Sequence, residues 1–186
     1  MGTAFAGPLL QRDHAALVVV DVQERLLPHV VGGEEVVANI VTLLRFARIV
    51  GLPVLLTEQL KLGPTVAEIR RELPGVDPIL KTEFGCLGCE GFTEALRGLG
   101  RKALILVGLE THICVMQTAL QAASEYTVHV VADAVSSRAL AEKDAALQRL
   151  VHSGVVVTTT ETLMYEVLAR AGTDEFRAVL ELVKSR

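Results

Sequence analysis

The sequence lacks the features that would suit a membrane, a nucleic acid or a disulfide framework. Its 186 residues contain no Trp, three Cys, and 18 Lys or Arg against 22 Asp or Glu, which gives a formal net charge of −4. The basic residues are scattered and form no stripe, so we expect no nucleic-acid partner. The apolar runs have the length of strands, far below the ~20 residues of a membrane-spanning helix, so we expect no membrane partner.

The scarcity of cysteine and of aromatic residues limits the chemistry further. The number of cysteines, three, is odd and does not suit a disulfide framework. The N-terminus also lacks the basic start and long apolar run of a secretory signal. Both points favour free thiols in a reducing compartment, and we predict a cytoplasmic protein. Two Tyr, five Phe and no Trp cannot build a large aromatic cage, so we expect a small pocket.

What the sequence does contain is an alternation of short apolar, β-branched runs with segments of helical spacing. Such runs fit strands buried on both faces of a parallel sheet, and the alternation is typical of right-handed βαβ crossovers. We therefore predict one α/β domain over residues 1–186, doubly wound, with a mainly parallel five- or six-stranded sheet and helices on both faces. Strands are expected at 15–20, 53–57, 103–108, 127–132 and 155–159, with a weaker one at 78–82, and helices at 36–51, 92–100, 139–154 and, in one or two pieces, 161–184.

Three reactive side chains follow different predicted strands. Asp21 comes directly after the strand at 15–20, and Lys81 lies near the end of the weak run. Cys114 follows the strand at 103–108, in the stretch GLETHICV. Because ligands of open parallel sheets bind beyond the carboxyl ends of the strands, we expect the acid, the amine and the thiol to meet at one edge.

These three groups together suit nucleophilic acyl transfer. A helix N-terminus and a nearby cation both favour a thiolate, so we expect a lowered pKa for Cys114 and fast alkylation well below pH 8. Asp21 could accept the thiol proton or hold Lys81 in place. Amides at the start of the helix would face the oxygen that becomes negative during attack on a carbonyl. The cluster thus predicts catalysis through a thioester.

Each residue also has an ordinary structural interpretation. A lone cysteine on an apolar helix usually packs in the core, an aspartate after a strand can cap a helix, and a lysine is often solvated. A non-catalytic α/β binding or scaffold protein is therefore the alternative to an enzyme. Dinucleotide binding is disfavoured, because no GxGxxG follows the first strand.

The runs LVVVDVQ, KTEF and GLETHICV, the last followed by QTALQAA, resemble the isochorismatase-like cysteine hydrolase family. The similarity covers about residues 14–165 and is closest to the isochorismatase domain-containing subgroup. It implies a Rossmann-like hydrolase fold and places the catalytic acid, lysine and cysteine of the family on Asp21, Lys81 and Cys114.

The resemblance also implies the backbone geometry of the turn that carries Cys114, the nucleophile turn. A cis peptide bond is expected between Leu109 and Glu110. The implied oxyanion donors are the backbone N–H groups of Glu110 and Cys114. Members of the family commonly associate, so we expect a homo-oligomer.

Four further residues are predicted to line the pocket: Gln23, Glu58, Phe84 and His112. Glu58 could instead be a solvated acid, Phe84 a core residue, and His112 a packing residue. The segment 136–138 suits either a helix cap or a contact to an anionic substrate.

The metal site of the nicotinamidases in this family uses histidines after the second strand, and TEQLKLGP contains none. We therefore predict neither a metal nor any other cofactor. A retained cysteine points to a small amide, imide or carbamoyl substrate, and acid-catalysed hydrolysis of an isochorismate-like vinyl ether is the alternative chemistry.

The stretch CLGC places Cys86 and Cys89 at the spacing of a redox dithiol or of half a zinc site. A zinc site needs two more ligands, and the sequence has no second pair. We favour a loop near the mouth of the active site over either function.

Overall fold

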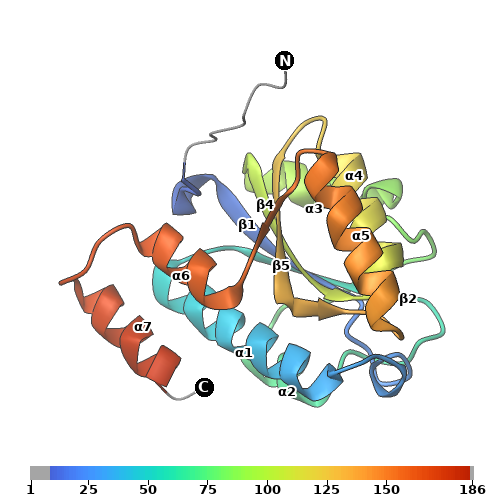
Figure 1. Cartoon of the computed structure of the whole chain (residues 1–186), viewed down its shortest axis with the longest axis horizontal. Helices are drawn as coiled ribbons and strands as arrows, with labels where there is room; N and C mark the ends of the chain where they lie inside the picture. Colours follow the sequence, from blue (N-terminus) through green and yellow to red (C-terminus); the bar gives the residue numbers. More distant parts are fainter. Residues whose placement is uncertain (1–8, 185–186) are drawn as a thin grey trace.

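The computed structural model describes residues 9–184. Six strands form one sheet in the order β3-β2-β1-β4-β5-β6, and every neighbouring pair is parallel. Helices cover both faces of this sheet (Figure 1), so the predicted doubly wound α/β fold is confirmed. The single domain was predicted over 1–186, and its ends, 1–8 and 185–186, lie outside the described residues.

The strands and helices follow the predicted alternation. The strands are β1 (Ala15–Val20), β2 (Val54–Gln59), β3 (Ile79–Lys81), β4 (Ala103–Leu109), β5 (Thr127–Ser136) and β6 (Val156–Thr158). The α-helices are α1 (Gly33–Val50), α2 (Ala67–Glu72), α3 (Glu90–Leu99), α4 (Met116–Ala122), α5 (Leu140–His152), α6 (Thr160–Leu168) and α7 (Asp174–Lys184). Short 3-10 turns lie at η1 (Arg12–His14), η2 (Leu27–His29) and η3 (Cys86–Gly88), and a π turn lies at η4 (Thr111–Val115).

Several bounds differ from the predicted ones. The weak run forms the short edge strand β3, and β5 continues four residues beyond the expected end. The C-terminal segment forms two helices, separated by a stretch in which Ala169 and Gly172 have positive φ angles. Helix α2 was not predicted, because its six residues AEIRRE are too few to show helical periodicity.

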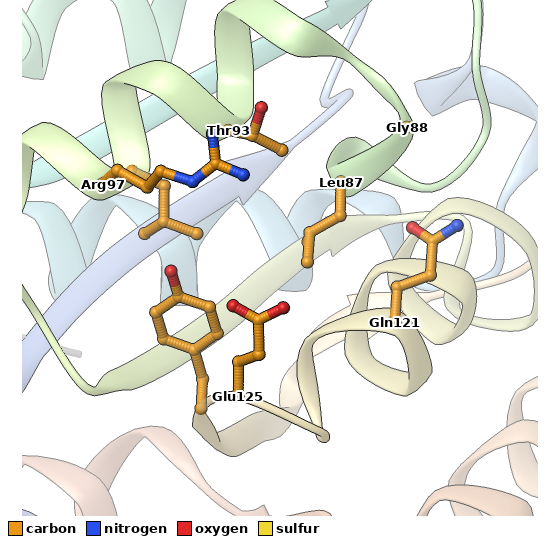
Figure 2. A pocket seen from close by; sticks show the side chains of 8 residues that line it. Leu87, Gly88, Thr93, Arg97, Gln121 and Glu125 are labelled. Atoms are coloured by element: carbon orange, nitrogen blue, oxygen red, sulfur yellow. The ribbon is translucent and has the colours of Figure 1, made fainter.

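One face of the sheet carries α3, α4 and α5. Side chains from these helices pack on alternate residues of β1, including Ala16, Val18 and Val20. A cavity of about 320 Å³ opens between η3, α3 and the end of α4, with Arg97 reaching in from α3 and Glu125 from the turn after α4 (Figure 2). None of the predicted site residues lines this cavity.

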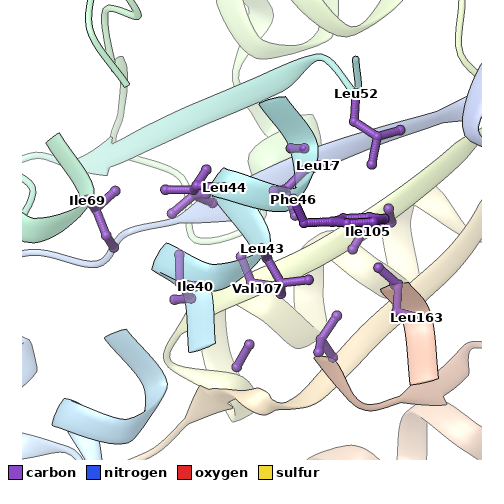
Figure 3. Packing of buried hydrophobic residues seen from close by; sticks show 14 of the residues in the cluster. Leu17, Ile40, Leu43, Leu44, Phe46, Leu52, Ile69, Ile105, Val107 and Leu163 are labelled. Carbon is purple, nitrogen blue, oxygen red and sulfur yellow. The ribbon is translucent and has the colours of Figure 1, made fainter. Parts of the chain in front are cut away.

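The other face carries α1, α2, α6 and α7. Phe46 and Leu43 of α1 pack over Leu17 of β1 and Ile105 of β4 (Figure 3). Each such side chain contributes roughly 1.5–3 kcal/mol when fully buried. Helix α1 ends at Val50 and is capped by Gly51, which has a left-handed backbone and whose N–H bonds back to the carbonyl of Ala47.

The two central strands approach closely at their carboxyl ends. Gly108 of β4 pairs with Val20 of β1 and has a φ angle of 119°, a backbone conformation that residues with a side chain rarely adopt. A Cβ atom at this position would collide with the backbone of Val20. Because Asp21 follows Val20, this glycine allows β1 to deliver Asp21 beside the end of β4.

None of the helices within residues 9–184 combines the length and apolar character that crossing a bilayer requires.

Candidate active site

Asp21 and Lys81 form a buried ion pair at the carboxyl edge of the sheet. Lys81 Nζ lies 2.5 Å from Asp21 Oδ2, and both side chains are 0% exposed. Thr57 Oγ1 donates to the other carboxylate oxygen, Asp21 Oδ1, at 2.7 Å. Because burying an ion pair is costly unless its remaining hydrogen bonds are also satisfied, these extra partners keep both charges in place.

The Lys81 ammonium has three further acceptors. It donates to Gln59 Oε1 at 2.8 Å and to the backbone carbonyls of Glu83 and Phe84 at 3.1 and 3.2 Å. A single cation therefore holds the end of β2, the acid after β1 and the segment after β3.

Cys114 lies in the π turn η4, between β4 and α4, and is 6% exposed. Such turns occur often at functional sites. Burial is the largest cause that raises the pKa of the thiol, and the charge of Asp21 and a hydrogen bond to its carboxylate raise it further. The charge of Lys81 acts in the opposite direction. The structure thus brings Asp21, Lys81 and Cys114 together as one cluster.

The predicted lowering of the Cys114 pKa is wrong. The sequence shows a cation and a helix start near the thiol, but it does not show that the sulfur is removed from water beside a carboxylate. These two influences outweigh the charge of Lys81, so the pKa lies above its ordinary value. The resting thiol is therefore neutral, with a carboxylate in reach of its proton.

The raised pKa of Cys114 also contradicts the fast alkylation that the sequence led us to expect. A thiol with a raised pKa stays protonated as the pH rises through the ordinary cysteine range, so its thiolate fraction at pH 7–8 is small. Burial raises the pKa of the Cys86 thiol to about 11, and Cys89 is half-buried. We expect iodoacetamide to modify Cys89 faster than Cys114 or Cys86 at pH 7.5, as measured by peptide mass spectrometry over time. Faster labelling of Cys114 would contradict the raised pKa.

The turn that carries Cys114 is joined to the segment after β5. The peptide bond between Leu109 and Glu110 is cis, as the resemblance implies. The Glu110 carboxylate accepts hydrogen bonds from Arg138 Nε and Nη2, each at 3.0 Å. His112 Nδ1 lies 2.9 Å from Ser137 Oγ.

Gln23 and Glu58 direct their polar atoms toward the loop after β2. Gln23 Nε2 donates to the carbonyls of Gln59 and Gly63 at 3.0 and 2.5 Å, and its Oε1 accepts the Gln59 N–H at 2.9 Å. Glu58 Oε1 accepts the N–H and the hydroxyl of Thr65, both at 2.7 Å. Gln23 fixes β2 and its loop, and the structure does not bring the Glu58 carboxylate to the cluster.

Phe84 and His112 lie closer to the cluster in different ways. Phe84 is 54% exposed, so it is not a core residue, while its carbonyl accepts from Lys81. His112 belongs to the same turn as Cys114. Their contact with a substrate stays a prediction.

Two residues that contact the cluster were missed from the sequence. Thr57 and Gln59 point to Asp21 and Lys81, whereas Glu58 between them points to the opposite face of β2. The alternation of side chains along a strand could have identified both, because positions two apart share a face.

The CLGC stretch divides into two different environments. Cys86 is fully buried, and its N–H donates at 2.9 Å to Thr118 Oγ1, which itself donates at 2.7 Å to the carbonyl of Cys114. Cys89 lies at the start of α3, and all three cysteines are free thiols. Across residues 9–184, no group of three or more His, Cys, Asp or Glu side chains is arranged to hold a metal ion.

The isochorismatase domain family model matches residues 15–162, most of the chain. The chain belongs to the isochorismatase family. It is 36% identical over 173 residues to isochorismatase domain-containing protein 2 of Danio rerio, covering 91% of this chain and 86% of that protein. It is also 34% identical over 168 residues to isochorismatase domain-containing protein 1 of Danio rerio, covering 88% of this chain and only 59% of that longer relative.

Three solved structures share the fold of this chain. The MAR1 ribonuclease from Caenorhabditis elegans has a TM-score of 0.88 and 30% identity, covering 95% of this chain and 92% of that one. YcaC from Pseudomonas aeruginosa, with hexane-2,5-diol and covalent acrylamide, has a TM-score of 0.87 and 27% identity, covering 98% of both chains. YcaC from Escherichia coli is described as an octameric hydrolase of unknown specificity. It has a TM-score of 0.86 and 25% identity, covering 99% of this chain and 90% of that one. Family and structures together give the chain a hydrolase fold.

Proposed function

We propose that this isochorismatase-family chain is a cysteine hydrolase that cleaves a small amide, imide or carbamoyl compound through a thioester on Cys114. The observation that carries the proposal is one buried carboxylate, Asp21, shared between the Lys81 ammonium and the Cys114 thiol. A neutral thiol hydrogen-bonded to a carboxylate is the arrangement that general-base activation of a nucleophile needs.

The proposed reaction begins with proton transfer from Cys114 Sγ to the Asp21 carboxylate. The sulfur then forms a bond to the carbonyl carbon, and the backbone N–H groups of Glu110 and Cys114 stabilise the oxygen that becomes negative. The carbonyl re-forms as the amine leaves, taking the proton from Asp21. Water, deprotonated by Asp21, hydrolyses the thioester and restores the thiol. Lys81 offsets the negative charge of the thiolate while the proton is on Asp21.

The printed names of two relatives point to different kinds of substrate. The structure of the P. aeruginosa relative contains covalent acrylamide, so a closely similar fold admits and binds covalently a small molecule that carries an amide. The C. elegans relative is named a ribonuclease. Here the net charge is −4, and Asp21, Lys81 and Cys114 are at most 6% exposed, which suits a small substrate more than a polyanion.

The test is to trap the thioester. We expect a screen of small amides, imides and carbamoyl compounds, quenched in acid, to yield an acyl adduct on the peptide that contains Cys114. The Cys114→Ala variant should form no adduct and show no turnover while keeping its melting temperature. Turnover that survives in Cys114→Ala would instead indicate attack by water assisted by Asp21, and absence of both adduct and turnover with every compound would favour the scaffold alternative.

We further propose that the protein acts in the cytoplasm as a homo-oligomer, without a cofactor. Three free thiols suit a reducing compartment, and the E. coli relative is described as an octamer. Size-exclusion chromatography with light scattering tests the assembly, and a monomer at micromolar concentration would contradict it.

A further inference from the structure

The turn that carries Cys114 depends on a contact that the proposed reaction does not use directly. Glu110 and Arg138 meet in a two-point ion pair, with Nε and Nη2 each 3.0 Å from a carboxylate oxygen. This geometry fixes both the position and the orientation of the carboxylate, which a single-point contact from a lysine would not do.

The two ends of this ion pair differ in exposure. The Glu110 side chain is 6% exposed, whereas that of Arg138 is 62% exposed. Burial raises the pKa of the Glu110 carboxyl, but Arg138, together with the nearby His112, outweighs burial and holds that pKa below its usual range. A fully exposed ion pair contributes little, but removing the partner of a buried carboxylate leaves a charge without compensation.

The backbone that precedes Arg138 is anchored by strand pairing and hydrogen bonds. Strand β5 ends at Ser136, which pairs in register with Leu109 at the end of β4. Ser136 Oγ donates to the carbonyl of Val31 at 2.5 Å, and the Val31 N–H donates to the carbonyl of Ser137 at 3.0 Å. The arginine therefore joins the nucleophile turn to a segment that is itself fastened to the sheet and to the loop before α1.

We propose that Arg138 is a positioning residue: by holding the Glu110 carboxylate, it orients the backbone N–H of Glu110 toward the oxygen that becomes negative. The proposal rests on the acyl transfer proposed for Cys114. Arg138 acts through Glu110 and not on the reacting atoms. A misdirected donor should slow attack on a carbonyl while leaving the thiol itself unchanged.

Two reactions of the same sulfur separate these effects. With p-nitrophenyl acetate, the sulfur attacks the carbonyl carbon, the oxygen becomes negative, and nitrophenolate leaves with the bonding electron pair. With iodoacetamide, the sulfur attacks a saturated carbon and displaces iodide, and no oxyanion forms. Only the first reaction needs the Glu110 N–H, because only it places negative charge on a carbonyl oxygen.

We expect Arg138→Met to slow acylation of Cys114 by roughly 10- to 100-fold, the scale of losing or misplacing one such donor. Alkylation by iodoacetamide should stay within about twofold of the wild-type rate, since its reaction lacks that requirement. Arg138→Lys should retain part of the acylation rate. In Arg138→Gly, added methylguanidine should restore acylation, and methylamine at the same concentration should restore less.

Control variants separate positioning from loss of fold. The double variant Glu110→Gln/Arg138→Met leaves no unpaired buried charge, and its acylation should be no slower than that of Arg138→Met, because both residues act as one unit. Arg45→Met removes another two-nitrogen contact, to Glu72 at 2.7 and 2.8 Å between α1 and α2, and should leave acylation unchanged.

The outcomes are distinct for each proposal. Equal slowing of acylation and alkylation, or acylation at the wild-type rate in Arg138→Met, would overturn the positioning role. Release of nitrophenolate at the wild-type rate in Cys114→Ala would overturn the proposed thioester chemistry instead.

Discussion

Asp21→Asn is expected to lower the turnover of an acyl substrate by about a thousandfold, within the 10²–10⁴ range that a general base contributes. The same substitution should speed alkylation of Cys114. The charge of Asp21 and its hydrogen bond raise the pKa of this thiol, and Lys81 lowers it. Removing the carboxylate leaves the lysine charge alone beside the sulfur, so the thiolate fraction at pH 8 should rise by about tenfold per unit of pKa lost.

Lys81→Met is the matched variant. It should also abolish most turnover, but it removes the only influence of the ion pair that favours the thiolate, so alkylation of Cys114 should become slower. Turnover of p-nitrophenyl acetate and iodoacetamide labelling, measured on the same preparations, give both results. If Asp21→Asn and Lys81→Met changed alkylation in the same direction, the assignment of Asp21 as the base for Cys114 would be wrong. Melting curves are needed for each variant, because each leaves a buried charge without its partner.

Gly108→Ala is expected to destabilise the protein by about 3–5 kcal/mol. The new Cβ would collide with the backbone of Val20, at a φ angle of 119° that alanine rarely adopts. Overpacking and an unfavourable backbone conformation each cost roughly 1–3 kcal/mol, and a central strand pair has no room to separate. Urea unfolding followed by circular dichroism gives the change in the free energy of unfolding.

Gly98→Ala is the control for the added methyl group. Gly98 lies in α3, and a Cβ there would meet nothing within 4 Å. Alanine should therefore stabilise the helix by up to about 1 kcal/mol. A variant Gly108→Ala as stable as Gly98→Ala would show that β1 and β4 do not need this close approach.

The sequence predicted the sheet well because its central strands are long apolar runs. Ala15–Val20 is buried throughout, and a run of this kind has few other stable placements. The edge strand Ile79–Lys81 has only three residues and was correspondingly weak. Helix α2 has one buried apolar residue, Ile69, so it offered no periodic signal.

The sequence predicted where the candidate site lies better than it predicted the burial of its side chains and the pKa of its thiol. Asp21 and Cys114 follow β1 and β4, Lys81 is the last residue of β3, and the structure brings the three side chains together. The burial of these side chains depends on the packing of segments that are distant in the sequence. For this reason the direction of the Cys114 pKa shift was predicted wrongly. The Glu110–Arg138 ion pair joins residues 28 positions apart and arises from the register of β4 against β5, which one sequence does not reveal.

The several acceptors around Lys81 have a practical consequence for chemical footprinting. Its side-chain nitrogen is buried and directed at four oxygen atoms, so amine-selective acylating reagents should bypass it while modifying the exposed Lys61 and Lys102. Only an opening of the segment after β3 would present this amine to reagent. The rate at which Lys81 is labelled, compared with the rates of the exposed lysines, would thus measure how often the segment after β3 opens.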